Sequence, residues 1–163
     1  MSEIDDPVLT LATRLGAAAL ARGMMIATAE SCTGGLVAGA ITAIAGSSAW
    51  FERGFVTYSN LAKEQQLGVA SSTIERFGAV SEETAKAMAE GAVRASLAQW
   101  AVAVTGIAGP DGGSPAKPVG TVWFAWAGPG YIQALHKRFD GGRRAVREAS
   151  VRVALEGLID RLA

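Results

Sequence analysis

The chain has 163 residues, half of them hydrophobic, which is enough for one domain with a substantial buried core. Its fifteen basic and fifteen acidic residues cancel, which argues against a protein that holds nucleic acid mainly through phosphate contacts. One cysteine and one histidine exclude an internal disulfide framework and a zinc cluster of thiolates and imidazoles.

The N-terminus is polar and acidic, and we expect residues 1–6 to form a flexible leader within a single domain spanning 1–163. This start lacks the basic and apolar parts of a signal peptide. No uncharged apolar run reaches the ~20 residues that are needed to span a membrane. We therefore expect a cytoplasmic protein without a membrane-spanning segment.

Apolar periodicity and turn residues divide the chain into alternating helices and strands. The first predicted elements are a helix over 7–22 capped by Gly23, a strand over 24–29, a helix over 36–45 ended by Gly46, and a strand over 55–58. The next are a short helix over 60–67 capped by Asn60, another over 71–77, a long helix from Ser81 to about Leu97, and a buried strand over 101–104.

A glycine- and proline-rich loop over 105–115 precedes the last elements. Strands over 120–126 and 132–139, joined by a turn at 128–130, predict an antiparallel hairpin, and a final helix covers 143–162. Helices alternating with strands, together with one hairpin, predict a single layered α/β domain with a mixed β-sheet flanked by helices.

Ser31 lies between the strand predicted over 24–29 and the helix that begins at Leu36. A strand-to-helix turn presents a hydroxyl beside unpaired helix N–H groups, which stabilise an anion or a developing oxyanion. Ser31 is therefore our candidate nucleophile. Two alternatives stay open: Ser31 or Thr33 only caps the helix, or the neighbouring Cys32 is the nucleophile rather than a small buried side chain.

A serine nucleophile requires a base, and the only histidine, His136, lies on a predicted strand away from the loops. The remaining candidates are Lys63 and Lys117, of which we favour Lys63 because it follows a strand end. A lysine that is neutral at pH 7 needs a pKa about three units below its usual value of about 10.4, which only a buried site provides. The polar run 63–66 is also typical of a solvated surface, and spacing alone does not decide between the two.

The loop after the strand over 101–104 shares an edge with the Ser31 turn if the two strands are parallel. It matches neither the Walker pattern nor Gly-x-Gly-x-x-Gly, so it either offers backbone donors to a small group or is a rigid surface turn. Arg143, Arg144 and Arg147 open the last helix, where they either bind a phosphate or form a solvated face.

Six motifs stand out along the chain: Thr28-Ala-Glu-Ser-Cys-Thr-Gly-Gly35, Gly46-Ser-Ser48, Tyr58-Ser-Asn60 with Lys63, Gly78-Ala-Val-Ser-Glu-Glu83, Val104-Thr-Gly-Ile-Ala-Gly-Pro110 and Lys117-Pro-Val-Gly-Thr121. This combination closely resembles the CinA C-terminal domain family, from the first predicted helix to the last. The first and fifth motifs are highly specific. One departure is Gly141-Gly142-Arg143, where the family often has Gly-Asp-Arg, and it puts a capping or arginine-orienting carboxylate there in doubt.

Members of that family include nicotinamide-nucleotide amidohydrolases, which hydrolyse the carboxamide of nicotinamide mononucleotide to nicotinate mononucleotide and ammonia without a metal. The resemblance implies an amidohydrolase of pyridine-nucleotide salvage, with a small nucleotide as substrate and no cofactor. It implies Ser31 as nucleophile and Lys63 as base, with Tyr58 and Thr105 as hydrogen-bonding groups. The substrate contacts that it implies are Glu30, Cys32, Thr33, Gly34 and Gly35 in the turn, Gly106, Ala108 and Gly109 in the loop, and Arg143 and Arg147.

The alternative function is a non-catalytic module that binds a nucleotide or a protein partner, in line with the competence and DNA-damage labels of the family. Direct binding of DNA is disfavoured by the neutral net charge and the lack of a basic stripe. The family, together with an apolar hairpin that contains Trp123 and Trp126, leads us to expect a homo-oligomer, either a dimer or a trimer.

Overall fold

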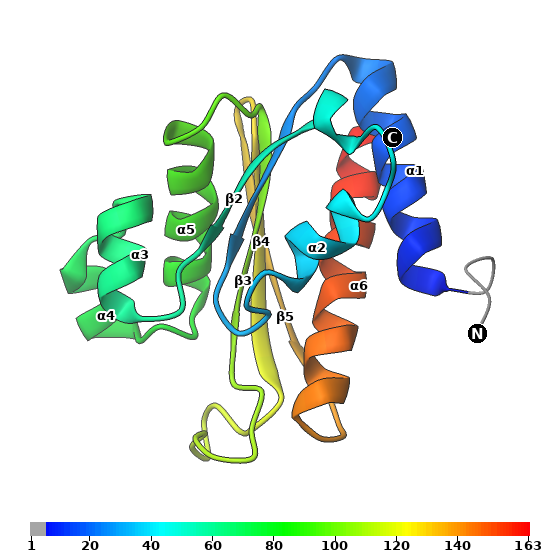
Figure 1. Ribbon diagram of the computed structural model, residues 1–163. Helices are drawn as coiled ribbons and strands as arrows, with labels where there is room; N and C mark the ends of the chain where they lie inside the picture. Colours follow the sequence, from blue (N-terminus) through cyan, green and yellow to red (C-terminus); the bar gives the residue numbers. More distant parts are fainter. Residues whose placement is uncertain (1–5) are drawn as a thin grey trace.

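The computed structural model describes residues 6–163, which form a five-stranded sheet between two layers of helices (Figure 1). The helices are α1 (Pro7–Arg22), α2 (Leu36–Thr42), α3 (Asn60–Leu67), α4 (Ser71–Phe77), α5 (Glu82–Arg94) and α6 (Arg143–Leu162), with a short 3-10 helix, η2 (Ser47–Ala49). The strands are β1 (Ile26–Glu30), β2 (Phe51–Val56), β3 (Trp100–Gly106), β4 (Thr121–Gly128) and β5 (Tyr131–Arg138). The predicted leader lies outside the described residues except for Asp6, whose carboxylate accepts the Val8 amide and caps α1.

The strands lie in the order β2-β1-β3-β4-β5. Strand β1 runs parallel to β2 and β3, whereas β4 runs antiparallel to β3 and β5, which confirms the predicted mixed sheet and hairpin. Glu30 is paired with Val104 across β1 and β3. The turn after β1 and the loop after β3 therefore leave the sheet at the same edge, as a parallel pair requires.

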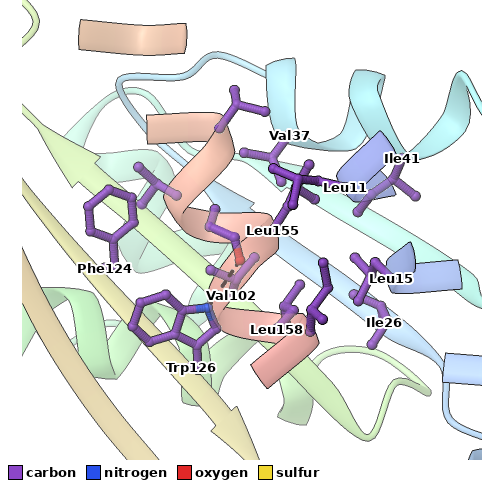
Figure 2. Packing of buried hydrophobic residues seen from close by; sticks show 14 of the residues in the cluster. Leu11, Leu15, Ile26, Val37, Ile41, Val102, Phe124, Trp126, Leu155 and Leu158 are labelled. Atoms are coloured by element: carbon purple, nitrogen blue, oxygen red, sulfur yellow. Dashed lines mark hydrogen bonds between the residues drawn. The ribbon is translucent and has the colours of Figure 1, made fainter. Parts of the chain in front are cut away.

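Helices α1, α2 and α6 cover one face of the sheet, and bulky side chains fill the space beneath them (Figures 1 and 2). Leu15, Phe124 and Leu155 are fully buried there. Trp126 is buried as well, and its indole N–H donates to the Ala154 carbonyl of α6 at 3.2 Å. The expectation that Trp126 offers a surface for subunit contact is therefore wrong, because α6 already covers it.

Helices α3, α4 and α5 cover the other face with much smaller side chains. Among the described residues, ten of the fourteen buried members of this cluster are alanine. At Gly91 a Cβ atom would collide with the carbonyl of Leu67, so the glycine lets α5 touch the end of α3. Arg94 strengthens this contact by donating to the same carbonyl at 3.1 Å. The glycine thus brings α3 close to α5.

Two predicted boundaries near the β2–α3 connection are wrong. Strand β2 begins at Phe51 and ends at Val56, rather than covering 55–58, because an edge strand that is half exposed does not need a continuous apolar pattern. The cap of α3 is Ser59 rather than Asn60, since the Ser59 hydroxyl accepts the Ala62 amide at 3.0 Å.

Two helices end earlier than predicted. Helix α2 stops at Thr42, whose hydroxyl donates back to the Ala38 carbonyl at 2.8 Å, and Gly46 precedes η2 instead of ending α2. Helix α5 stops at Arg94, and the Ser96 hydroxyl then bonds to the Ala92 carbonyl. In both places a hydroxyl competes for backbone groups at the helix end, which apolar periodicity does not register.

Candidate active site

Ser31 and Lys63 meet at the carboxyl end of β1. Ser31 follows directly after β1, and Lys63 lies in the first turn of α3, 32 residues further along the chain. The Lys63 Nζ atom is 2.9 Å from the Ser31 Oγ atom. Ser31 is 8% exposed and Lys63 only 1% exposed, so the contact is shielded from water. This arrangement excludes the solvated surface charge that the polar run 63–66 also allowed.

Two backbone carbonyls complete the surroundings of the lysine. Lys63 Nζ donates to the Thr57 oxygen at 2.9 Å and to the Tyr58 oxygen at 3.2 Å. No carboxylate contacts this nitrogen among the residues that the structure describes. A neutral amine has two N–H donors and one lone pair, so the carbonyls take the donors and leave the lone pair for the hydroxyl of Ser31.

Burial lowers the pKa of the Lys63 ammonium from its ordinary value of 10.5 to about 8, because removal from water disfavours the charged form. At pH 7 about one tenth of the molecules then hold a neutral lysine, compared with fewer than about one in a thousand for a free lysine side chain. Lys63 therefore has the protonation behaviour that a general base requires near neutral pH.

Backbone contacts around Glu30 bring the β2–α3 connection to the serine. The Thr57 amide donates to the Glu30 carbonyl at 2.7 Å, and the Ser31 amide donates to the Val104 carbonyl at 2.9 Å. The Ser59 cap then starts α3 in the direction that carries Lys63 inward. The backbone at Glu30 and Ser31 is therefore held between the β2–α3 connection and β3. Lys63 approaches the serine from the side of the β2–α3 connection.

The side chain of Glu30 is fully buried and caps α2 from the preceding strand. Its Oε1 atom accepts the Thr33 hydroxyl at 2.6 Å and the Val37 amide at 2.9 Å, and its Oε2 atom accepts the Ala38 amide at 3.0 Å. The helix end that we expected to be free for an anion is thus already occupied by a carboxylate. Glu30 supports the turn from beneath.

The candidate oxyanion donors are reduced to two by the contacts within the turn. The Gly34 amide donates to the Ser31 carbonyl at 3.0 Å, and the Gly35 amide donates to Glu30 at 3.3 Å. The amides of Cys32 and Thr33 have no acceptor oxygen within the described part of the chain. Thr33 is fully buried, so the Cys32 amide is the remaining candidate donor to a substrate carbonyl beside Ser31.

Cys32 is unsuited to act as the nucleophile. The thiol is 6% exposed, and burial raises its pKa to about 12. Since the thiolate is the reactive form, this cysteine is a small buried side chain. His136 is equally removed from the site, because it lies on β5 and stacks on Trp123 with ring centroids 5.0 Å apart.

Thr105 and Tyr58 lie on different sides of the serine. Thr105 is in β3, next to the residue whose carbonyl holds the Ser31 amide, and its hydroxyl donates to the Ala79 carbonyl at 2.8 Å. Tyr58 contributes its carbonyl to Lys63, whereas its phenol is mostly exposed and accepts from Arg143 at 3.2 Å. Only the backbone of Tyr58 contacts the serine–lysine pair.

The two arginines predicted to bind phosphate both hold backbone carbonyls around the site. Arg143 donates to Gly109 at 2.9 Å, and Arg147 donates to Cys32 at 3.1 Å and to Thr33 at 3.4 Å. Helix α6 is thereby tied to the serine turn and to the loop after β3. Each guanidinium still has donors left for an additional acceptor.

Gly106, Ala108 and Gly109 belong to the end of β3 and to the loop that follows, on the edge shared with Ser31. The Gly106 α-carbon packs tightly against Val122, and Gly109 has a positive φ of 82°. Sequence reasoning missed the carbonyls of Thr57 and Tyr58, since a backbone group carries no side-chain signal. No group of three or more His, Cys, Asp or Glu side chains in residues 6–163 is arranged to hold a metal ion.

Comparisons with known proteins identify the family of the chain. The sequence model of the CinA C-terminal domain matches residues 8–162. Nicotinamide-nucleotide amidohydrolase PncC of Pseudomonas putida is 56% identical over 154 residues, which cover 94% of this chain and 96% of that protein. The protein of the same name from Escherichia coli K12 is 54% identical over 157 residues, which cover 94% of each chain.

A solved structure is also similar throughout. The crystal structure of competence/damage inducible protein CihA from Agrobacterium tumefaciens has a TM-score of 0.94 and 52% sequence identity, and the match covers 98% of each chain. Within residues 6–163, no helix is both long and apolar enough to cross a membrane. Both the sequence and the fold show that this chain belongs to the CinA C-terminal domain family.

Proposed function

We propose that the protein is a nicotinamide-nucleotide amidohydrolase that converts nicotinamide mononucleotide to nicotinate mononucleotide and ammonia. The observation that carries this proposal is the buried contact of 2.9 Å between Lys63 Nζ and Ser31 Oγ, which is the geometry of a nucleophile and its base. Relatives named nicotinamide-nucleotide amidohydrolase PncC, which match nearly the whole chain, supply the substrate class.

Acylation begins when neutral Lys63 accepts the proton of Ser31 Oγ while that oxygen attacks the carboxamide carbon. The amide of Cys32 binds the oxyanion that develops, and one such donor is typically worth roughly 3–4 kcal/mol of transition-state stabilisation. Lys63 then returns the proton to the amide nitrogen. The C–N bond breaks, ammonia leaves, and an ester of Ser31 remains.

Deacylation repeats these steps with water. Lys63 accepts a proton from the attacking water molecule, the second oxyanion binds to the same N–H group, and the ester bond to Ser31 breaks. Lys63 returns the proton to Ser31 Oγ as the carboxylate product leaves. The net reaction consumes one water molecule per amide, and it needs no metal or cofactor.

The remaining contacts of the substrate belong to the two neighbouring segments. Gly106, Ala108 and Gly109 border the nucleotide from the loop after β3, and Thr105 supplies a hydroxyl beside Ser31. The spare N–H groups of Arg143, and of Arg147 beside it, receive the phosphate at the start of α6.

The direct test measures ammonia and nicotinate mononucleotide formed from nicotinamide mononucleotide in the presence of a chelator. We expect turnover by the wild type, and its loss in Ser31→Ala and in Lys63→Ala. Lys137→Ala, on the exposed strand β5, is the matched control and keeps the wild-type rate. Binding of the nucleotide without turnover by the folded wild type would instead support a non-catalytic binding module.

We further propose that the protein acts in the cytoplasm as a homo-oligomer, a dimer or a trimer, and without contacting nucleic acid. The buried free thiol of Cys32 suits a reducing compartment. Leu36, Val56 and Leu61 are large apolar side chains that are 42–59% exposed, and such residues are candidates for a subunit contact. Light scattering coupled to gel filtration gives the oligomeric mass and tests this proposal.

A further inference from the structure

Lys117 makes a contact that the proposed reaction does not explain. It lies in the glycine- and proline-rich segment between β3 and β4, residues 107–119, and is partly buried. Its Nζ atom donates to the carbonyl of Phe77, at the end of α4, at 2.7 Å. A charge-assisted hydrogen bond therefore joins this segment to a turn 40 residues earlier in the chain.

The turn that receives the lysine, residues 77–80, is held at each of its first three carbonyl groups. The donors are Lys117 to Phe77, Ser81 and Thr84 to Gly78, and Thr105 to Ala79. All four of these bonds are between 2.7 and 2.9 Å long. Because all four donors bind this one short turn, a displacement of the turn at Lys117 also displaces the acceptor of Thr105.

The turn over 77–80 reaches the serine through Thr105. The Ser31 amide donates to the carbonyl of Val104, so Thr105 is the next residue of the strand beside the nucleophile. The Thr105 hydroxyl in turn donates to Ala79. Lys117 and Ser31 are thus joined by a continuous path of three hydrogen bonds and two short runs of backbone, 77–79 and 104–105.

A second cation holds the other end of the segment over 107–119. Arg143 of α6 donates to the carbonyl of Gly109, and α6 packs on the opposite face of the sheet from α4. The base of the segment is closed by a hydrogen bond from the Ile107 amide to the Thr121 carbonyl at 2.9 Å. The segment is therefore fastened to both helical layers across the edge where Ser31 lies (Figure 1).

The ammonium of Lys117 fits closely against Gly78. This glycine has φ 84° and ψ 165°, a backbone conformation that residues other than glycine rarely adopt. A Cβ atom on Gly78 would lie 3.1 Å from Lys117 Nζ. Glycine at this position therefore allows both the sharp end of α4 and the approach of the lysine.

We propose that Lys117 is a positioning residue of the amide-hydrolysing site, an inference that rests on the proposed function. Its ammonium clamps the segment over 107–119 onto the carbonyl of Phe77. The clamp keeps the segment where it borders the nucleotide, and through the turn over 77–80 it keeps Thr105 beside Ser31. Lys117 itself contacts neither reacting atom.

The test compares Lys117→Met, which keeps the length of the side chain but loses the donor, with Lys117→Arg, which retains a cationic donor. Lys137→Met is the matched control on an exposed strand. For Lys117→Met we expect the KM for nicotinamide mononucleotide to rise about tenfold or more, with kcat reduced by less than about threefold. Lys117→Arg recovers most of the affinity, because it restores a charged donor to the carbonyl.

Hydrogen exchange in the absence of substrate separates the clamp from the reaction. We expect faster exchange in Lys117→Met over 77–80 and 107–119, with unchanged protection of α5. This result would stand even if the wild type hydrolysed no amide, in which case only the proposed function fails. Wild-type exchange in both segments, or a loss of protection throughout α5, would overturn the clamp, because Lys117 would then be dispensable or essential to the whole fold.

Discussion

The two faces of the sheet are packed in different ways, although the same strands supply both. Under α1, α2 and α6 the core consists largely of Leu, Ile, Val, Phe and Trp side chains (Figure 2). Under α3, α4 and α5 it consists largely of alanine. The bulky face buries more apolar area per residue and contributes more to stability. The alanine face lets helices approach closely, and it is the side from which Lys63 reaches Ser31.

This difference assigns stability mainly to the bulky face and catalysis mainly to the alanine face. A buried lysine needs walls that exclude water and still provide hydrogen-bond acceptors. The tightly packed layer of α3 and α5 supplies such walls, and the carbonyls of Thr57 and Tyr58, in the connection just before α3, supply the acceptors. The large side chains on the opposite face hold the sheet in place. Substitutions on the two faces should therefore have different consequences.

The largest effect is expected at the serine–lysine pair. Loss of a nucleophile or its base lowers kcat by roughly 10³- to 10⁶-fold in enzymes of this chemistry, and we expect values in that range for Ser31→Ala and Lys63→Met. Lys63→Met should leave the free energy of unfolding unchanged or higher, because it removes an ammonium group that has no carboxylate partner from a buried place. Steady-state kinetics and urea unfolding measure both quantities. A marked loss of stability in Lys63→Met would contradict the assignment.

The comparison of faces is tested most sharply by two substitutions to alanine. Leu155→Ala, on the bulky face, should lower the free energy of unfolding by about 2–5 kcal/mol while kcat per folded molecule is retained. Gly91→Ala, on the alanine face, should lower it by only about 1–3 kcal/mol, but it should reduce kcat because the new Cβ pushes α3 and Lys63 away. Unaltered kcat in Gly91→Ala would show that the approach of α3 is not needed for the chemistry.

Glu30→Gln probes the support beneath the nucleophile turn. The carboxylate accepts N–H and O–H donors with both oxygens, so an amide nitrogen at one position faces another donor. We expect a loss of about 1.5–3 kcal/mol in the free energy of unfolding, together with a lower kcat. Glu148→Gln, on the exposed surface of α6, is the control. Equal stability of the two variants would mean that the Glu30 carboxylate does not stabilise the nucleophile turn.

The pH dependence of activity follows from the lysine. Because burial lowers the pKa of Lys63 to about 8, the neutral base becomes more abundant as the pH rises. We expect kcat/KM to increase about tenfold per pH unit below pH 8 and to level off above it. A profile measured from pH 6 to 9.5 checks this. A flat profile across pH 7 to 9 would exclude Lys63 as the group that must lose its proton.

The smallest expected effect is on stability at alkaline pH. Between about pH 8 and 10.5 the unfolded chain still binds the Lys63 proton whereas the folded protein has released it, so the free energy of unfolding rises with pH. One proton contributes at most about 1.4 kcal/mol per pH unit. Burial raises the pKa of Cys32 to about 12, which acts in the opposite direction above pH 9. Comparison with Lys63→Met cancels this term, and the free energy of unfolding of the wild type relative to that variant should increase from pH 8 to 10.5.

The element order and the mixed sheet could be predicted from the sequence, because they depend on apolar periodicity and on glycine positions such as Gly23. The parallel pairing of β1 with β3 was only a condition for the two loops to share an edge, and the structure fulfils it. The proximity of Ser31 and Lys63 was suggested by the family resemblance, whereas the polar run 63–66 pointed equally to a solvated surface. Burial of Lys63 depends on the approach of α3 to α5, which Gly91 permits and no local pattern reveals.

The supporting role of Glu30 and the carbonyls around Lys63 could not be predicted from the sequence for a different reason. The side chain of Glu30 lies on the side of β1 that α2 covers, so its carboxylate reaches the N–H groups of α2 rather than a ligand. The carbonyls of Thr57 and Tyr58 orient the lysine, but backbone atoms are common to every residue type. Sequence motifs identify reactive side chains well, and they give little information about the groups that hold them.

Trapping of the covalent intermediate tests the central claim most directly. Nicotinamide mononucleotide is incubated with the wild type and hydroxylamine, which competes with water for an acyl-enzyme. The serine–lysine mechanism predicts that the hydroxamate forms alongside nicotinate mononucleotide, in a ratio that increases with hydroxylamine concentration, and that Ser31→Ala forms neither product. Formation of the acid alone at every hydroxylamine concentration, with turnover retained in Ser31→Ala, would contradict the account.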